Sequence, residues 1–206
     1  HKDEGINISL LPKLKLEGKI FNKIKIFAKN GSELPICFGL TKELLYLLGL
    51  YIAEGHAERN FLLLSVHEKD FQNVFNKCTE KIGIKVSERK QNRGDFNINN
   101  CLLSDVFSNL CGTSSRNKKL PSWYLELSEQ QLSWLLSAYF SGDGTVTDNE
   151  IQASSASKRL ISDLSYALLR YGINARIRKK RKYATNTLQK TKRQYFEVVI
   201  SGRDNL

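Results

Sequence analysis

Residues 47–56 of the chain are LLGLYIAEGH, and residues 136–145 are LSAYFSGDGT. Each stretch predicts an apolar helix that ends in one acidic residue followed by glycine, the acids being Glu54 and Asp143. An acid at the C-terminal end of a helix is unfavourable, because the helix dipole places partial negative charge there. One such acid could simply be a solvated cap, but two at matching positions point to a function.

The two acids lie 89 positions apart, and the same offset relates other features of the chain. The stretch IGIKVSER at 82–89 falls on YGINARIR at 171–178, with a glycine at the same place in each. Each copy predicts an apolar helix, a strand pair, an amphipathic helix closed by glycine, and a second strand pair. The sequence therefore predicts an α+β protein built from two similar units.

The predicted elements divide the chain into an N-terminal extension (1–40), a first unit with its linker (41–120) and a second unit (121–206). The predicted helices and outer strands have these bounds: helices 41–54, 68–82, 101–112, 127–142 and 157–171, and strands 84–90, 95–100, 173–182 and 194–201. The second copy reaches SGRDNL where the counterpart of helix 101–112 would begin, so we expect that helix to be missing. In the extension, residues 13–28 alternate apolar and basic residues around Gly18, which predicts a strand or hairpin with one basic face.

Composition narrows the class of partner. The 206 residues include 32 Lys and Arg against 21 Asp and Glu, a formal net charge of +11. This charge favours phosphate-rich partners over acidic proteins or neutral small molecules, the alternative being a solvated basic surface. With no apolar run of membrane-spanning length and no signal peptide, we expect a cytoplasmic protein. A chain that starts with His1 and lacks Met is expected to be a piece of a longer product.

The cysteines form no metal-binding or disulfide pattern. No CxxC pair occurs, and each thiol lies in an apolar or helical stretch, so the sequence predicts reduced core thiols at all four positions, Cys37, Cys78, Cys101 and Cys111.

Small residues follow one face of each apolar helix. Gly49 and Ala53 lie four apart on the first, and Ala138 and Gly142 lie four apart on the second. Such stripes let two helix backbones approach closely, with the flanking bulky residues packing into two cores. Those flanking residues are Leu47, Leu50, Tyr51, Leu136, Tyr139 and Phe140.

Helices packed in this way would end together and bring Glu54 and Asp143 side by side. The two carboxylates would repel each other, and a divalent cation would remove the conflict. Carboxylate oxygens suit Mg²⁺, which takes one or two carboxylates and completes its shell with water and phosphate oxygens. Such a cation can activate water and stabilise both oxygens of a phosphodiester displacement.

The paired stretches LLGLYIAEG and LSAYFSGDG resemble the two motifs of LAGLIDADG homing endonucleases. ELPICFGLTKELLYLLGLYIAEG and KKLPSWYLELSEQQLSWLLSAYFSGDG are similar to the segments leading into the motifs of the intein-associated (DOD-type) branch, and SASKRLISDLSYALLRYGINARI is similar to the segment that follows the second. The resemblance covers residues 34–206. It implies two pseudo-symmetric αββαββ(α) units that form a saddle of antiparallel sheets over double-stranded DNA. It also implies Mg²⁺-dependent cleavage of both strands across the minor groove, leaving 3′ overhangs.

The resemblance also assigns roles to residues at the centre. Glu54 and Asp143 would bind the metal and each serve one DNA strand, with the backbone carbonyls of Ala53 and Gly142 as further ligands. A lysine near the attacking water would be Lys119 or Lys118, in RNKKLP, and the second unit ends before its counterpart.

Basic and polar residues alternate on the predicted outer strands, and those on one strand face can read bases or bind phosphates in the major groove. Residues 174–193 hold nine basic side chains and no acid, although an edge strand kept soluble by lysine would have the same pattern. The candidates in the first unit are Lys85, Ser87, Arg89, Gln91, Asn92, Arg93, Asn97 and Asn99. Those in the second are Asn174, Arg176, Arg178, Lys180, Lys182, Gln189, Lys190, Lys192 and Arg193.

The sequence thus predicts a monomeric, site-specific DNA endonuclease with a long asymmetric target, either the endonuclease region of an intein or a freestanding relative. Protein splicing itself is not expected, because the chain neither begins with Cys or Ser nor ends in His-Asn. The alternative is a LAGLIDADG-type RNA maturase or a DNA-binding protein that does not cleave.

Overall fold

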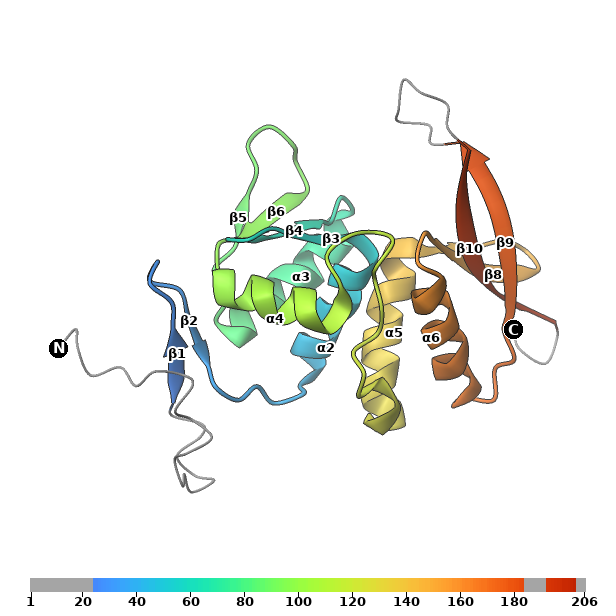
Figure 1. The fold of residues 1–206 in the computed structure, drawn as a ribbon, viewed down its shortest axis with the longest axis horizontal. Helices are drawn as coiled ribbons and strands as arrows, with labels where there is room; N and C mark the ends of the chain where they lie inside the picture. The colour runs from blue at the N-terminus through green and yellow to red at the C-terminus, as the bar shows by residue number, and fades with distance from the viewer. Residues whose placement is uncertain (1–23, 184–191, 203–206) are drawn as a thin grey trace.

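The computed structural model describes residues 24–183 and 192–202. Two runs of elements in it have the same order, helix, two strands, helix, two strands (Figure 1). The first run comprises α2 (Lys42–Glu54), β3 (Gly55–Ala57), β4 (Leu62–Ser65), α3 (Lys69–Ile82), β5 (Ser87–Glu88) and β6 (Asp95–Ile98), and it is followed by α4 (Cys101–Cys111). The second comprises α5 (Glu129–Asp143), β7 (Gly144–Val146), β8 (Glu150–Ser155), α6 (Lys158–Leu169), β9 (Arg176–Tyr183) and β10 (Lys192–Ser201). A short 3₁₀ helix, η2 (Tyr124–Glu126), precedes α5.

Each run forms one four-stranded antiparallel sheet. The strand orders are β3-β4-β6-β5 and β7-β8-β10-β9, which are the same topology. The predicted α+β class with two αββαββ units is therefore confirmed. The described residues end just after β10, and no helix corresponding to α4 follows β10 among them.

Local sequence explains where the two central helices begin and end. The Thr41 side chain accepts a hydrogen bond from the backbone N–H of Leu44, and Ser128 forms a capping box with Gln131. At the C-terminal end of each helix the chain passes directly into a strand at a glycine, Gly55 after α2 and Gly144 after α5. A Cβ on Gly144 would lie 2.1 Å from the Phe140 carbonyl oxygen, so only glycine fits after the acid.

Helices α2 and α5 lie side by side at the centre, with one sheet to either side of them (Figure 1). A Cβ on Gly49 would lie 2.3 Å from the Leu135 carbonyl oxygen and 2.7 Å from the Ala138 Cβ. A Cβ on Gly142 would lie 2.8 Å from the Ala53 Cβ. The two small-residue stripes thus face each other across a seam too narrow for larger side chains.

The cores lie between the helices and one face of each sheet. In the first half, Leu62 and Leu64 on β4 and Ile98 on β6 are buried against the helices. In the second, Ala153 on β8 and Val198 on β10 occupy the corresponding places. The opposite sheet faces carry Ser65, Asn97, Ser154 and Glu197, as strand alternation requires.

Two predictions from sequence need correction. Strand 84–90 is much shorter than predicted, since β5 covers only Ser87–Glu88. The strand or hairpin predicted around Gly18 lies largely outside the described residues; within them, β1 (Lys25–Phe27) pairs with β2 (Glu33–Pro35), and the chain turns at residues 28–32. All four cysteines are free, but Cys37 is exposed and Cys101 only partly buried, because both lie near the ends of elements rather than under a sheet.

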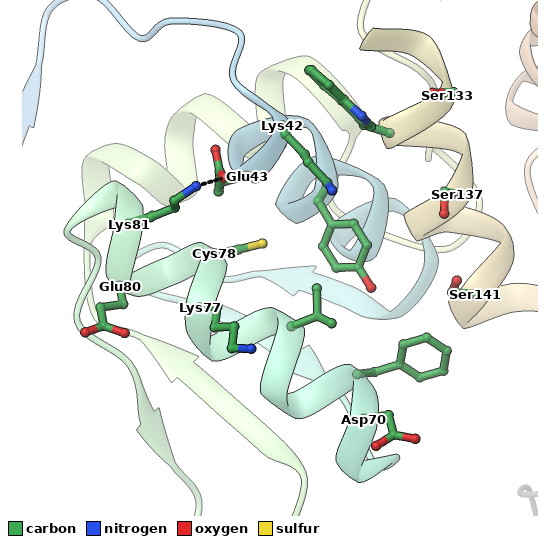
Figure 2. A pocket seen from close by; sticks show the side chains of 14 residues that line it. Lys42, Glu43, Asp70, Lys77, Cys78, Glu80, Lys81, Ser133, Ser137 and Ser141 are labelled. Atoms are coloured by element: carbon green, nitrogen blue, oxygen red, sulfur yellow. Dashed lines mark hydrogen bonds and ion pairs between the residues drawn. The ribbon is translucent and has the colours of Figure 1, made fainter. Parts of the chain in front are cut away.

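A groove of about 980 Å³ lies between α2, α3 and α5 (Figure 2). Its lining includes the apolar side chains of Phe71, Val74 and Trp134, and the ion pair between Lys81 and Glu43, 2.6 Å long, lies at its side. The acids Glu54 and Asp143 do not line it, so it is separate from the site described next. No described helix is long and apolar enough to cross a membrane.

Candidate metal centre and nucleic-acid interface

The seam between α2 and α5 places Glu54 and Asp143 at adjacent helix ends. A Cβ on Gly142, the residue before Asp143, would lie 3.3 Å from the Glu54 Cγ. The two carboxylates are close enough for Glu54 to raise the pKa of Asp143. The predicted meeting of the two acids is therefore what the structure shows.

The protein raises the pKa of both carboxyl groups above their ordinary values. Burial is the main cause that raises the pKa of Asp143, to about 7, and the neighbouring Glu54 raises it further, while Lys118 and Tyr139 oppose the shift. The Glu54 side chain reaches solvent, yet the protein around it still desolvates its carboxylate and raises its pKa, against the opposing effect of His67. Two acids held in these conditions favour a shared proton or a bound cation.

Lys118 is the basic residue at this centre. Its side chain is only 4% exposed, and its Nζ donates a 2.6 Å hydrogen bond to the carbonyl oxygen of Tyr51 in the last turn of α2. The same nitrogen lies 3.4 Å from the centre of the Tyr51 ring. Burial lowers the pKa of Lys118 to about 7, although Cys111 and Asp143 favour its charged form.

Long-range contacts of the linker decide which of the two candidate lysines reaches the centre. The Ser157 hydroxyl donates to the Lys118 carbonyl oxygen (2.6 Å), and the Leu120 N–H donates to the Asp163 carboxylate (3.1 Å). These bonds turn Lys118 inward. Lys119 instead lines a separate cavity of about 530 Å³ with Arg116, Lys158 and Arg159.

Tyr139 belongs to the centre, although its apolar position predicted only a core residue. It is fully buried one helical turn before Asp143, and burial followed by the charge of Asp143 raises its pKa well above the ordinary value. Its hydroxyl interacts with the Asp143 carboxyl, which raises the pKa of Tyr139 and lowers that of Asp143, although the geometry of the pair falls outside that of a standard hydrogen bond. Tyr139 is therefore a second group, besides Lys118, that favours the ionised form of Asp143.

A small cavity opens beside Glu54. It measures about 140 Å³ and is lined by residues from the end of α2, the end of β4 and the end of α5. The polar lining residues are Glu54, Ser65, His67, Glu68 and Ser141. His67 lies two residues after the end of β4, and its imidazole is near enough to Glu54 to lower the pKa of that carboxyl.

The predicted DNA-contacting residues of the first half gather on the outer hairpin. Ser87 and Asn97 are direct partners across β5 and β6, and the Arg89 side chain donates to the Asn97 amide oxygen (3.0 Å). The other five are solvent-exposed and flank these strands or form the loop between them: Lys85, Gln91, Asn92, Arg93 and Asn99.

In the second half the predicted residues follow β9, the outer edge strand. Arg178 makes two hydrogen bonds to Glu150 (2.6 and 3.1 Å), and Arg176 donates to Ser201 (2.6 Å). Lys180 lies 2.7 Å from Glu197. Asn174 is exposed just before β9; Lys182, Lys192 and Arg193 lie on the two strands with side chains outside the described part, as Gln189 and Lys190 are entirely.

Known proteins are similar to this chain in sequence or in fold. The profile of the LAGLIDADG-like domain family matches residues 130–206. The chain is 30% identical over 151 residues to DNA-directed RNA polymerase subunit Rpo1C of Methanocaldococcus jannaschii, covering 70% of this chain and 18% of that protein. It is 31% identical over 173 residues to the replication factor C small subunit of the same organism, covering 80% of this chain and 9% of that protein. The chain thus spans less than a fifth of the length of these relatives.

Two solved structures have a similar fold. I-DmoI, in a complex with DNA and Mn, superposes with a TM-score of 0.55 at 13% identity and covers 81% of this chain and 93% of I-DmoI. The N-terminal LAGLIDADG domain of DUF199/WhiA superposes with a TM-score of 0.54 at 14% identity and covers 82% of this chain and 80% of that chain. The chain therefore has the LAGLIDADG fold, and its residues 130–206 match the LAGLIDADG-like domain family.

Proposed function

We propose that this chain is the catalytic region of a site-specific homing endonuclease. It hydrolyses phosphodiester bonds on both strands of double-stranded DNA across the minor groove, leaves 3′ overhangs and uses Mg²⁺. The observation that carries this proposal is the pair of desolvated carboxylates, Glu54 and Asp143, at the end of the helical seam. Such a pair does not stabilise the fold, because the two carboxylates repel each other and burial disfavours their ionised forms.

The donor set fits magnesium. The described residues contain no group of three or more His, Cys, Asp or Glu able to hold a metal by themselves. Two carboxylates with water and substrate phosphate oxygens are what Mg²⁺ accepts, whereas a structural zinc site needs four protein ligands. The carbonyls of Ala53 and Gly142 lie in the last helical turns, where carbonyl groups lack partners within the helix, so they can add further oxygen ligands.

The residues around the acids then have separable roles. When bound, Mg²⁺ would supply activation of water and stabilisation of the leaving oxygen. Lys118, with a pKa of about 7, can hold or release a proton at its Nζ near neutral pH. In its charged form it opposes the negative charge that develops on the scissile phosphate. The buried Tyr139 hydroxyl can donate to Asp143 and so favour the ionised carboxylate that would hold the cation.

The similarity to small parts of two functionally different proteins supports the proposal that this chain is an element inserted into host proteins. An RNA polymerase subunit and a replication factor subunit have different functions, yet this chain is similar to a small part of each. A segment shared in this way is best explained as an intein-associated endonuclease carried within host proteins. On this proposal the chain acts as a monomer, since both acids come from one polypeptide.

The experiment that tests this function starts from randomised duplex DNA. Selection for bound sequences yields the target, and the chain is then incubated with that duplex and Mg²⁺. We expect both strands to be cut a few nucleotides apart. Binding without cleavage would favour the alternative of a non-cleaving DNA-binding protein, and preference for folded intron RNA over the duplex would favour an RNA maturase.

Cation binding should depend on pH through Asp143. The folded pKa of this carboxyl is raised to about 7, so below that pH the protonated form predominates and competes with the cation. The apparent affinity for Mn²⁺ should therefore fall about tenfold for each pH unit below 7, one proton being displaced per ion. Titrations between pH 5.5 and 8.5 measure this, and an affinity that is constant over the range would contradict the assignment of Asp143 as a ligand.

Replacement of Lys118 should slow cleavage without weakening DNA binding. Methionine has a similar length and removes the buried amine, so Lys118→Met should fold at least as stably as the wild type. We expect a single-turnover cleavage rate about 10²–10³ lower, the usual cost of removing one donor at a developing charge. Lys119→Met is the matched control, and an equal loss in both variants would remove Lys118 from the centre.

A further inference from the structure

Each sheet carries an acidic residue at an equivalent place on its polar face. In the first sheet Asp95 on β6 is the direct partner of Ser65 on β4, and in the second Glu197 on β10 is the direct partner of Ser154 on β8. The serine hydroxyl donates to the carboxylate in both, at 2.7 Å for Asp95 and 2.8 Å for Glu197. The same acid and serine pair therefore recurs in both halves.

Both acids are buried on the sheet faces that are expected to contact the negatively charged DNA. Asp95 is 9% exposed and Glu197 is 1% exposed, although the surrounding strands carry the residues predicted to contact DNA. A carboxylate facing phosphates is repelled, and its burial is costly unless charge or hydrogen bonds compensate. Apolar or amide side chains would fill these positions at lower cost.

Each acid holds a side chain predicted to contact DNA. The Asn92 amide donates to Asp95 Oδ2 (3.3 Å), and the Lys180 Nζ lies 2.7 Å from Glu197 Oε2. Asn92 is exposed and the Lys180 side chain is 42% exposed, so both reach solvent from a buried anchor. Each carboxylate therefore lies between a serine hydroxyl and a side chain predicted to contact DNA, and the contact of Glu197 with Lys180 is an ion pair rather than a hydrogen bond of standard geometry.

We propose that Asp95 and Glu197 are positioning residues for DNA recognition, each orienting one contacting side chain in its own half of the target. This inference rests on the proposed DNA-binding function. A free lysine is attracted to any phosphate, whereas Lys180 paired with Glu197 has part of its charge neutralised and its ammonium group kept close to one place on the sheet. Glu197 thereby lowers the non-specific affinity for DNA and raises the discrimination between bases in the second half-site. Asp95 has the same effect through Asn92 in the first half-site.

The test compares Glu197→Gln with the wild type on randomised duplexes. Glutamine keeps an oxygen for the Ser154 hydroxyl but loses the charge that holds Lys180. We expect tighter non-specific binding, a salt dependence steeper by about 0.9 in the log-log slope, and a loss of about tenfold in base discrimination confined to the second half-site. Asp95→Asn should lose discrimination only in the first half-site.

Two controls separate positioning from charge and from stability. Glu126→Gln makes the same change in net charge at an exposed residue of η2, away from both sheets, and should leave base discrimination unchanged. Thermal unfolding shows whether either sheet variant is destabilised. Discrimination that is unchanged in Glu197→Gln, or that falls equally across the whole target with a lower melting temperature, would overturn the proposal.

The outcome also separates this inference from the nuclease proposal. Wild-type chain that binds a preferred duplex but does not cut it would contradict the nuclease and leave the discrimination test intact. Wild-type chain that binds no duplex would overturn both.

Discussion

The Glu54→Gln, Asp143→Asn double variant is expected to bind its selected duplex with nearly wild-type affinity and to lose cleavage. Both side chains keep their size, so the seam between α2 and α5 stays packed, but no carboxylate remains to hold a divalent cation. The loss should exceed the factor of about 10²–10³ that follows removal of a single stabilising donor. Single-turnover cleavage with Mg²⁺ measures it, alongside binding in Ca²⁺.

The same variant should be more stable than the wild type in the absence of metal. Because burial raises the folded pKa of Asp143 to about 7 from an ordinary value of 3.8, the ionised form is better solvated in the unfolded chain. Above pH 7 the charged carboxylate therefore destabilises the fold, and between pH 4 and 7 stability falls as pH rises. Asparagine removes this cost. A lower melting temperature for the variant at pH 8 would contradict the desolvation argument, and residual cleavage near the wild-type rate would remove both acids from the mechanism.

Gly49→Ala is expected to be strongly destabilising, although alanine favours helices over glycine by about 1 kcal/mol. The added Cβ would lie 2.3 Å from the Leu135 carbonyl oxygen, which is backbone and cannot rotate away. The helices must separate, at a cost of about 2–3 kcal/mol, or roughly 4–12 °C in melting temperature. Separation also moves Glu54 away from Asp143, so cation affinity should fall together with stability.

Gly39→Ala provides the matched control for this substitution. A Cβ on Gly39 would contact only the Thr41 side chain, at an ordinary 3.6 Å. Its stability should stay within about 0.5 kcal/mol of the wild type. If Gly49→Ala were as stable as this control, the close seam between α2 and α5 would be wrong.

Local chemistry explains which parts of the fold could be predicted from sequence. The small stripes, the acid before glycine and the capping residues Thr41 and Ser128 all act within a few residues of their own helix. They occur in both halves because each central helix packs against the other through the same kind of small residues. The central helices and the meeting of Glu54 and Asp143 were therefore predictable.

Other parts of the site depend on contacts between distant segments. Lys118 and Lys119 are neighbours in the chain, and only the bonds to Ser157 and Asp163 decide that Lys118 turns inward. The role of Tyr139 was hidden because an aromatic residue on an apolar helix predicts core packing. Its only signal is the four-residue spacing to Asp143, which places both on one helix face.

The positions of Asp95 and Glu197 were hidden by an interruption of the repeat. The second outer hairpin is much longer than the first, with strands of 8 and 10 residues against 2 and 4. The 89-residue offset therefore fails before Glu197 is reached. Strand pairing restores the equivalence, since Ser65 and Ser154 keep that offset and each faces its acid.

The central claim is that Glu54 and Asp143 together hold one divalent cation. Electron paramagnetic resonance of Mn²⁺, titrated into the wild type and into each single variant with the selected duplex present, tests it most directly. We predict saturable binding by the wild type at pH 8 and a loss of at least about tenfold in affinity from either Glu54→Gln or Asp143→Asn. Mn²⁺ affinity that survives both substitutions unchanged would contradict the account.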